Sequence, residues 1–87
     1  MDLDIYFWHS TTGVEVDLVL YGKNKLIAIE VKASKKIDRK DFKGLLEFKK
    51  DYPVAQLFYL YAGDREEVHG DITAMSIVKF LENFKTL

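Results

Sequence analysis

Two short stretches with a strict alternation of apolar and other residues constrain the fold of this chain most strongly. From Val14 to Leu20 every even position is apolar, which is the period of a strand with one buried face. The run 26–32 alternates in the same way, with apolar side chains at Ile27, Ile29 and Val31. The segment 22–25 between them reads Gly-Lys-Asn-Lys, which is typical of a tight turn. The two runs therefore predict the arms of one β-hairpin.

The charged residues of this hairpin indicate a specific chemistry. A hairpin symmetric about residues 23 and 24 would place Asp17 opposite Glu30, and Glu15 opposite Lys32. Opposed side chains have Cβ atoms about 5 Å apart. At an effective dielectric near 20, like charges at this distance repel by roughly 3 kcal/mol. A divalent cation such as Mg²⁺ or Mn²⁺ between Asp17 and Glu30 would offset the repulsion, and Lys32 beside it could polarise a water or stabilise a phosphate.

A purely structural interpretation of the same residues stays open. Lys32 could pair with Glu15 while Asp17 is solvated at a strand end, and the hairpin would then carry only a charged face. A bulge or an odd-numbered loop would also break the symmetric register on which the cation site depends.

At this point the sequence resembles a known family. An acidic residue on one strand followed by Glu-x-Lys on the next is similar to the PD-(D/E)xK nuclease superfamily, which includes restriction endonucleases and Holliday-junction resolvases. The stretches 8–17 and 28–34 more particularly resemble the uncharacterised nuclease-like domain at the C-terminal end of many prokaryotic AAA-type ATPases. The resemblance runs from about Ile5 to Phe84. It implies that Asp17 and Glu30 are metal-binding carboxylates, that Lys32 is a catalytic lysine, and that the cofactor is Mg²⁺ or Mn²⁺.

The chain also departs from the superfamily pattern. Val16 stands where the superfamily name has proline, and only Asp2 and Asp4 precede the first strand, where such nucleases usually carry a helix with a further glutamate. The helix after the lysine has no glutamine, which active members of one large branch place there. These departures keep a second function open, that of a catalytically reduced remnant acting as a nucleic-acid-binding or dimerisation module.

The remaining residues predict the element order βββαββα. Residues 5–9 form the first strand, and a helix with Asp38 as its N-cap ends at 52–53. A nearly continuous apolar run at 56–61 predicts a central strand, residues 68–75 hold one or two short strands, and Ser76 caps a last helix. The residues expected to face inward from the two helices are Phe42, Leu45, Leu46, Phe48, Ile77, Phe80, Leu81 and Phe84. The fold class is α/β (α+β), a restriction-endonuclease-like mixed sheet without the usual first helix.

Length and composition predict a single nuclease-like domain over residues 1–87, a truncated or stand-alone version of the ATPase-associated domain. The 48% hydrophobic and 31% charged residues are typical of a globular protein. The absence of cysteine excludes a disulfide framework and a thiolate metal site. No basic segment followed by an apolar run marks a signal peptide, and no membrane span is expected, so the predicted location is the cytoplasm.

The net charge of −1 gives no overall reason to bind nucleic acid, but the charge is unevenly distributed. Residues 32–43 contain six basic side chains against two acidic ones. We expect Lys35, Lys36, Arg39 and Lys43 to contact the DNA backbone without reading bases, although lysines on an exposed helix face also serve solubility alone.

His9 at the end of the first strand and Glu15 are candidate auxiliary residues. The sequence thus predicts a metal-dependent DNA nuclease, a homodimer through the open aromatic first strand, and an AAA-type ATPase as a further partner.

Overall fold

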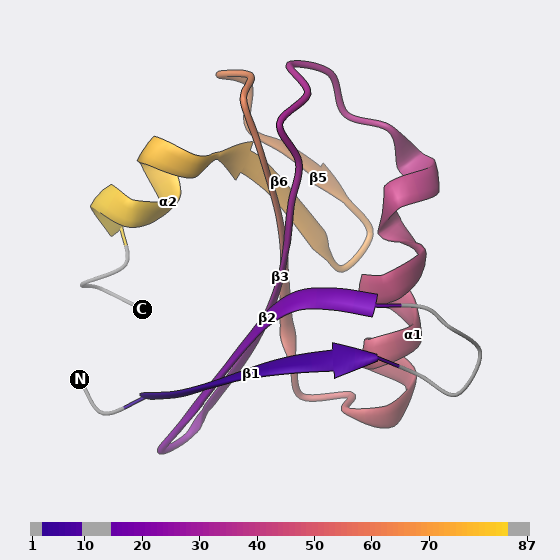
Figure 1. Cartoon of the computed structure of the whole chain (residues 1–87), viewed down its shortest axis with the longest axis vertical. Helices are drawn as coiled ribbons and strands as arrows, with labels where there is room; N and C mark the ends of the chain where they lie inside the picture. The colour runs from indigo at the N-terminus through magenta and orange to yellow at the C-terminus, as the bar shows by residue number, and fades with distance from the viewer. Residues whose placement is uncertain (1–2, 10–14, 84–87) are drawn as a thin grey trace.

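The computed structural model describes residues 3–9 and 15–83, which form one six-stranded mixed sheet with helices on its two faces (Figure 1). Strands β1 and β2, β2 and β3, and β5 and β6 pair antiparallel, whereas β3 and β4, and β4 and β6, pair parallel. The strand order is β1-β2-β3-β4-β6-β5. The elements are β1 (Leu3–His9), β2 (Glu15–Gly22), β3 (Lys25–Val31), the 3₁₀ helix η1 (Arg39–Phe42), α1 (Lys43–Asp51), β4 (Gln56–Tyr61), β5 (Glu67–His69), β6 (Ile72–Ser76) and α2 (Ile77–Asn83).

This arrangement confirms a mixed α and β fold. The region for which one or two strands were predicted holds two, the short edge strand β5 and the longer β6. Strand β4 lies between β3 and β6, and Leu57, Tyr59 and Leu60 are buried, as expected for a central strand covered on both faces.

The hairpin of β2 and β3 has the register that its two alternating runs predicted. Gly22 pairs with Lys25, and the pairing continues without interruption to Leu18 opposite Ile29. Asn24 in the turn has a φ of 65°, in the left-handed region that asparagine tolerates better than most residues. The symmetric hairpin is therefore confirmed over these five residue pairs.

A bulge in β2 makes one part of the predicted alternation wrong. Tyr6 of β1 pairs with Val19, but Trp8 pairs with Val16, so β2 carries one extra residue between these two points. As a result Val16 packs with Val19 in the hydrophobic cluster beneath α1, whereas Leu18 contacts the cluster on the opposite face. Val16 and Leu18 were expected to share one face. The predicted positions of Val14 and of the Glu15 side chain lie outside the described residues.

The core consists of two layers divided by the sheet. On the α1 side, Leu45 and Phe48 pack against Ala28 of β3 and Tyr59 of β4. On the α2 side, the smaller cluster gathers around Phe80. The larger layer, on the α1 side, lies on the same side of the sheet as the candidate site described below.

Both helical segments begin where the sequence predicted and the first ends there too, but their buried faces are narrower than expected. The Asp38 carboxylate accepts a hydrogen bond from the Lys40 backbone N–H at the start of η1, and the Ser76 hydroxyl accepts one from the Lys79 N–H at the start of α2. Leu46, Ile77 and Leu81, expected to face inward, are exposed. Each short helix meets the sheet along a single row of side chains, which leaves the flanking apolar positions in solvent. Phe84 lies outside the described residues.

Candidate active site

Asp17 lies where strands β2 and β3 cease to pair. The recorded pairs end at Leu18 opposite Ile29, and one step beyond them the Asp17 Oδ2 atom accepts a hydrogen bond from the Val31 backbone N–H at 2.8 Å. Asp17 lies in the bulged part of β2, between Val16 and Val19, and therefore outside the regular pairing of β2 with β1. This bond holds the Asp17 carboxylate against β3, next to Glu30.

Glu30 is a buried acid beside that carboxylate. It pairs with Tyr59 of the central strand, is 9% exposed, and its Oε1 atom has no hydrogen-bond partner in the described part of the chain. The pKa of Glu30 is raised from 4.5 to about 7, mainly by burial and also by a hydrogen bond with Asp17 and the Asp17 charge, while Lys32 opposes the shift. The charge of Asp17 therefore contributes to the raised pKa of Glu30, although burial contributes more.

Lys32 completes the group of residues predicted to be catalytic. Its Nζ atom lies 3.8 Å from Glu30 Oε2 and 3.8 Å from Asp41 Oδ1, and the side chain is 39% exposed. The structure therefore brings Asp17, Glu30 and Lys32 together at one place. We call Asp17 and Glu30 the acidic pair.

Two residues at this place were not predicted from the sequence. The Tyr59 hydroxyl donates a hydrogen bond to Asp41 Oδ2 at 2.9 Å, and burial together with this bond raises the pKa of Tyr59 to about 12. Asp41 in turn contacts Lys32, so Tyr59 and Asp41 position the lysine from the side opposite Glu30. A tyrosine in the middle of a mostly buried strand was a signal for such a partner, because a buried phenol requires a hydrogen bond.

The acidic pair offers fewer ligands than a closed metal site. Within residues 3–9 and 15–83 no group of three or more His, Cys, Asp or Glu side chains is placed to hold a metal ion. Mg²⁺ is often bound by only one or two protein carboxylates, with water and substrate phosphate as the other ligands. The unpartnered Oε1 of Glu30 beside Asp17 is an oxygen that such a cation would satisfy. The two carboxylates present fit a divalent cation whose remaining ligands are water or substrate phosphate.

Asp17 also borders a cavity of about 540 Å³. His9, at the end of β1, lines the same cavity, so the structure brings this candidate auxiliary residue close to the acidic pair. The side chain of Glu15, the other candidate, lies outside the described residues.

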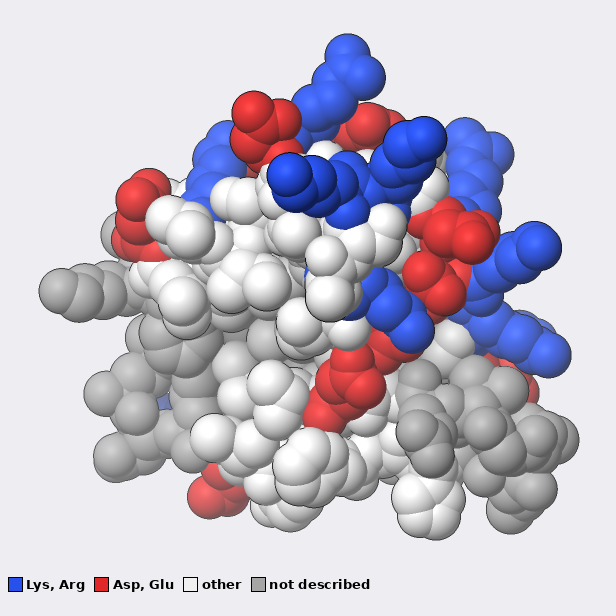
Figure 2. Space-filling model, turned by 45° about the horizontal axis from the view of Figure 1, so that its top comes forward, with Lys and Arg blue, Asp and Glu red and all other residues white. Residues whose placement is uncertain are grey.

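The basic residues predicted to contact DNA divide into two groups. Lys35, Lys36 and Arg39 line a cavity of about 410 Å³ at the end of β4, together with Arg65 and His69. Lys43 belongs to a second hollow, along α1 with Lys40 and Lys50, and Arg39 lines this hollow as well as the cavity. Figure 2 shows Lys and Arg side chains gathered over this end of the molecule, with acidic side chains between them.

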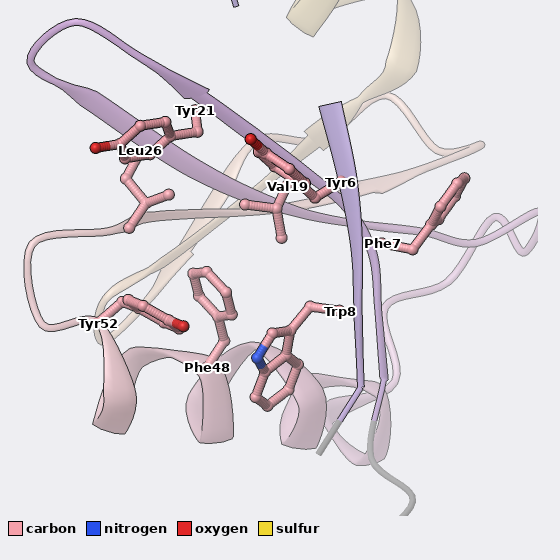
Figure 3. Close-up of a pocket in the computed structure, with 8 residues that line it drawn as sticks. All are labelled: Tyr6, Phe7, Trp8, Val19, Tyr21, Leu26, Phe48 and Tyr52. Atoms are coloured by element: carbon pink, nitrogen blue, oxygen red, sulfur yellow. The ribbon is translucent and has the colours of Figure 1, made fainter. Parts of the chain in front are cut away.

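The aromatic residues of β1 border an apolar groove between β1–β3 and α1 (Figure 3). Trp8 packs edge-on against Phe48 with ring centroids 5.2 Å apart, and Tyr52 stacks on Phe48 at 4.6 Å. Phe7 points away from the groove and is 80% exposed. Trp8 is thus a packing residue, while Phe7 is left on the surface of the edge strand.

Residues 1–80 match the family described as "Domain of unknown function (DUF4143)", and the chain belongs to this family. Domains of the family are often found in ATPase-associated proteins. Neither the search of curated proteins nor the search of solved structures finds a match. None of the helices in the described part of the chain is long and apolar enough to cross a membrane.

Proposed function

We propose that this protein is a metal-dependent DNA nuclease of the PD-(D/E)xK type, in which Asp17 and Glu30 bind Mg²⁺ or Mn²⁺ and Lys32 acts on the phosphate or the attacking water. The observation that carries the proposal is the buried Glu30 carboxylate, whose Oε1 atom has no hydrogen-bond partner among the described residues. The same carboxylate interacts with Asp17, and its Oε2 atom lies 3.8 Å from Lys32 Nζ. A buried polar atom of this kind costs stability unless a ligand satisfies it, which is a common property of functional sites.

Each residue has a distinct task in this proposal. A bound Mg²⁺ or Mn²⁺ would polarise a phosphodiester oxygen and lower the pKa of a bound water. The acidic pair supplies the two carboxylates, and Glu30 must give up its proton for both to be charged. Lys32, held between Glu30 and Asp41, presents its ammonium group to negative charge that develops on the phosphate. Tyr59 keeps Asp41, and through it Lys32, in place.

The family and the sheet support further parts of the proposal. The site residues lie on or next to three neighbouring strands of the mixed sheet, β2, β3 and β4. This placement is in keeping with a restriction-endonuclease-like fold. The frequent association of the family with ATPases favours an AAA-type ATPase as a partner. The exposed Ile5, Tyr6 and Phe7 of the edge strand β1 favour a homodimer, because unpaired apolar edges tend to associate.

One observation favours the second function, a non-catalytic binding or dimerisation module. The described residues include no third acidic or histidine ligand beside the acidic pair, and the apolar groove of Figure 3 lies open next to the edge strand. In this case the raised pKa of Glu30 would reflect its burial, and no cation would be needed.

A nuclease assay separates the two functions. Purified protein is incubated with Mg²⁺ or Mn²⁺ and a panel of single-stranded, duplex and branched DNA, alongside Lys32→Ala and the control Lys50→Ala. Lys50 is an exposed lysine of α1 that pairs with Glu47. We expect cleavage by the wild type and by Lys50→Ala, and loss of at least a hundredfold in Lys32→Ala. Equal behaviour of the wild type and Lys32→Ala on every substrate would exclude the enzymatic function.

A further inference from the structure

The basic cavity at the end of β4 has the construction of an anion site. Lys35, Lys36, Arg39 and Arg65 line it, and none of these four has a carboxylate within ion-pair distance in the part of the chain that the structure describes. Glu67, the acidic residue of the lining, is already engaged by His69. Four cationic side chains and one carboxylate, that of Glu67, therefore line a cavity of about 410 Å³, which leaves an excess of positive charge.

Two loops are held together to form this cavity. The Ala62 backbone N–H donates to the Ser34 carbonyl at 2.9 Å, and the Tyr61 hydroxyl donates to the Arg65 carbonyl at 2.7 Å. Gly63 lies so close to the neighbouring loop that a Cβ there would meet the Tyr61 ring and stand 2.7 Å from the Lys35 carbonyl oxygen. The close approach of the loops brings Arg65 to the same cavity as Lys35 and Lys36, which are distant from it in sequence.

His69 orients Arg39 within the cavity. In the tautomer that donates from Nε2 to Glu67 Oε1 at 3.0 Å, the Nδ1 atom is free to accept from Arg39 Nη2, which lies 3.5 Å away. The ring also packs on Phe42, with centroids 5.3 Å apart. A guanidinium fixed from behind in this way presents its remaining N–H groups to a ligand, in the fork geometry that suits phosphate oxygens.

We infer that this cavity binds a phosphate group of the nucleic acid strand, next to the phosphate that is cut. The inference rests on the proposed function for the identity of the strand as DNA. Arg39 and Asp41 belong to the same 3₁₀ helix, η1, and Asp41 contacts Lys32 of the candidate active site. The helix η1 therefore contributes a residue to the cavity and another to the surroundings of Lys32, so one strand that follows η1 could place phosphates at both. Arg39 and Arg65 are assigned as phosphate ligands, and His69 as the positioning residue of Arg39.

Titration with inorganic phosphate tests the cavity without DNA or metal. Backbone and His69 ring signals of the wild type, Arg39→Gln, and the control Lys50→Gln are followed by nuclear magnetic resonance. Lys50 has the same charge but lies on the outer side of α1. We expect shifts confined to residues around the cavity and an affinity about tenfold lower in Arg39→Gln, with Lys50→Gln unchanged. No shift at these residues, or equal weakening by both variants, would overturn the inference.

Short oligonucleotides identify the strand as the source of the phosphate. In Ca²⁺, binding of single-stranded DNA is measured at several salt concentrations for the wild type, Arg65→Gln and Lys50→Gln, each checked by its melting curve. We expect Arg65→Gln to weaken binding and to reduce the salt slope by about one, beyond any effect of Lys50→Gln. Phosphate binding without this effect on DNA would overturn the assignment to a strand. A Lys32→Ala variant that cuts as well as the wild type refutes the nuclease proposal while leaving the phosphate titration intact, so the two failures are distinguishable.

Discussion

Replacing Glu30 by glutamine tests the burial and charge of the acidic pair. Because the pKa of Glu30 is raised from 4.5 to about 7 in the folded protein, the folded state binds more protons than the unfolded state between these two values. The free energy of unfolding therefore falls as the pH rises through this window. A pKa difference of this size lowers the free energy of unfolding by about 3 kcal/mol at pH values above 7. Glutamine is always neutral and can donate to Asp17 as the protonated acid does, so Glu30→Gln should escape the loss.

Urea unfolding at a series of pH values, from below 4.5 to above 7, measures this effect for the wild type, Glu30→Gln and the exposed control Glu82→Gln. The difference in unfolding free energy between Glu30→Gln and the wild type should grow with pH to about 3 kcal/mol, or roughly 10 °C or more in melting temperature. Taking the difference cancels the titration of other groups. A difference that is constant across this range, or an equal trend in Glu82→Gln, would refute the assigned environment of Glu30.

Three further predictions follow from the same contacts. Binding of Mn²⁺ should release close to one proton at a pH well below 7 and almost none well above it, measured by calorimetry in buffers of different ionisation enthalpy; equal release at both would place the metal away from Glu30. Gly63→Ala should destabilise the protein by about 1–3 kcal/mol, because its Cβ meets the Tyr61 ring and the Lys35 carbonyl; an unchanged melting curve would show that the loops are not packed so closely. Tyr59→Phe should cost about 1–2 kcal/mol by removing the bond to Asp41, and a neutral effect in urea unfolding would contradict the role of that bond.

The hairpin register was predictable because two independent signals agreed on it. The alternation of the two runs and the Lys23-Asn24 turn each fix the pairing, and together they led to the proximity of Asp17 and Glu30. The bulge in β2 could not be located, because it depends on how β1 packs Trp8 against Phe48, a contact between distant segments.

The surroundings of the candidate site were less accessible to sequence reasoning. Asp41 had the spacing of a helix-start residue, and its bonds to Tyr59 and Lys32 arise only when β4 is inserted beside β3. His69 was assigned no function because nothing in its local sequence shows that β5 returns it to Arg39 and Phe42. Local patterns specify which elements form, whereas the contacts between their ends depend on the order of strands in the sheet.

The central claim is that Asp17 and Glu30 hold one divalent cation beside Lys32. Diffraction from crystals soaked in Mn²⁺, with data collected at the manganese absorption edge, tests this claim most directly. We predict an anomalous peak at about 2.0–2.2 Å from one oxygen of each carboxylate, which disappears in crystals of the Glu30→Gln protein. A peak elsewhere, or none between the two carboxylates at saturating Mn²⁺, would contradict the proposed site.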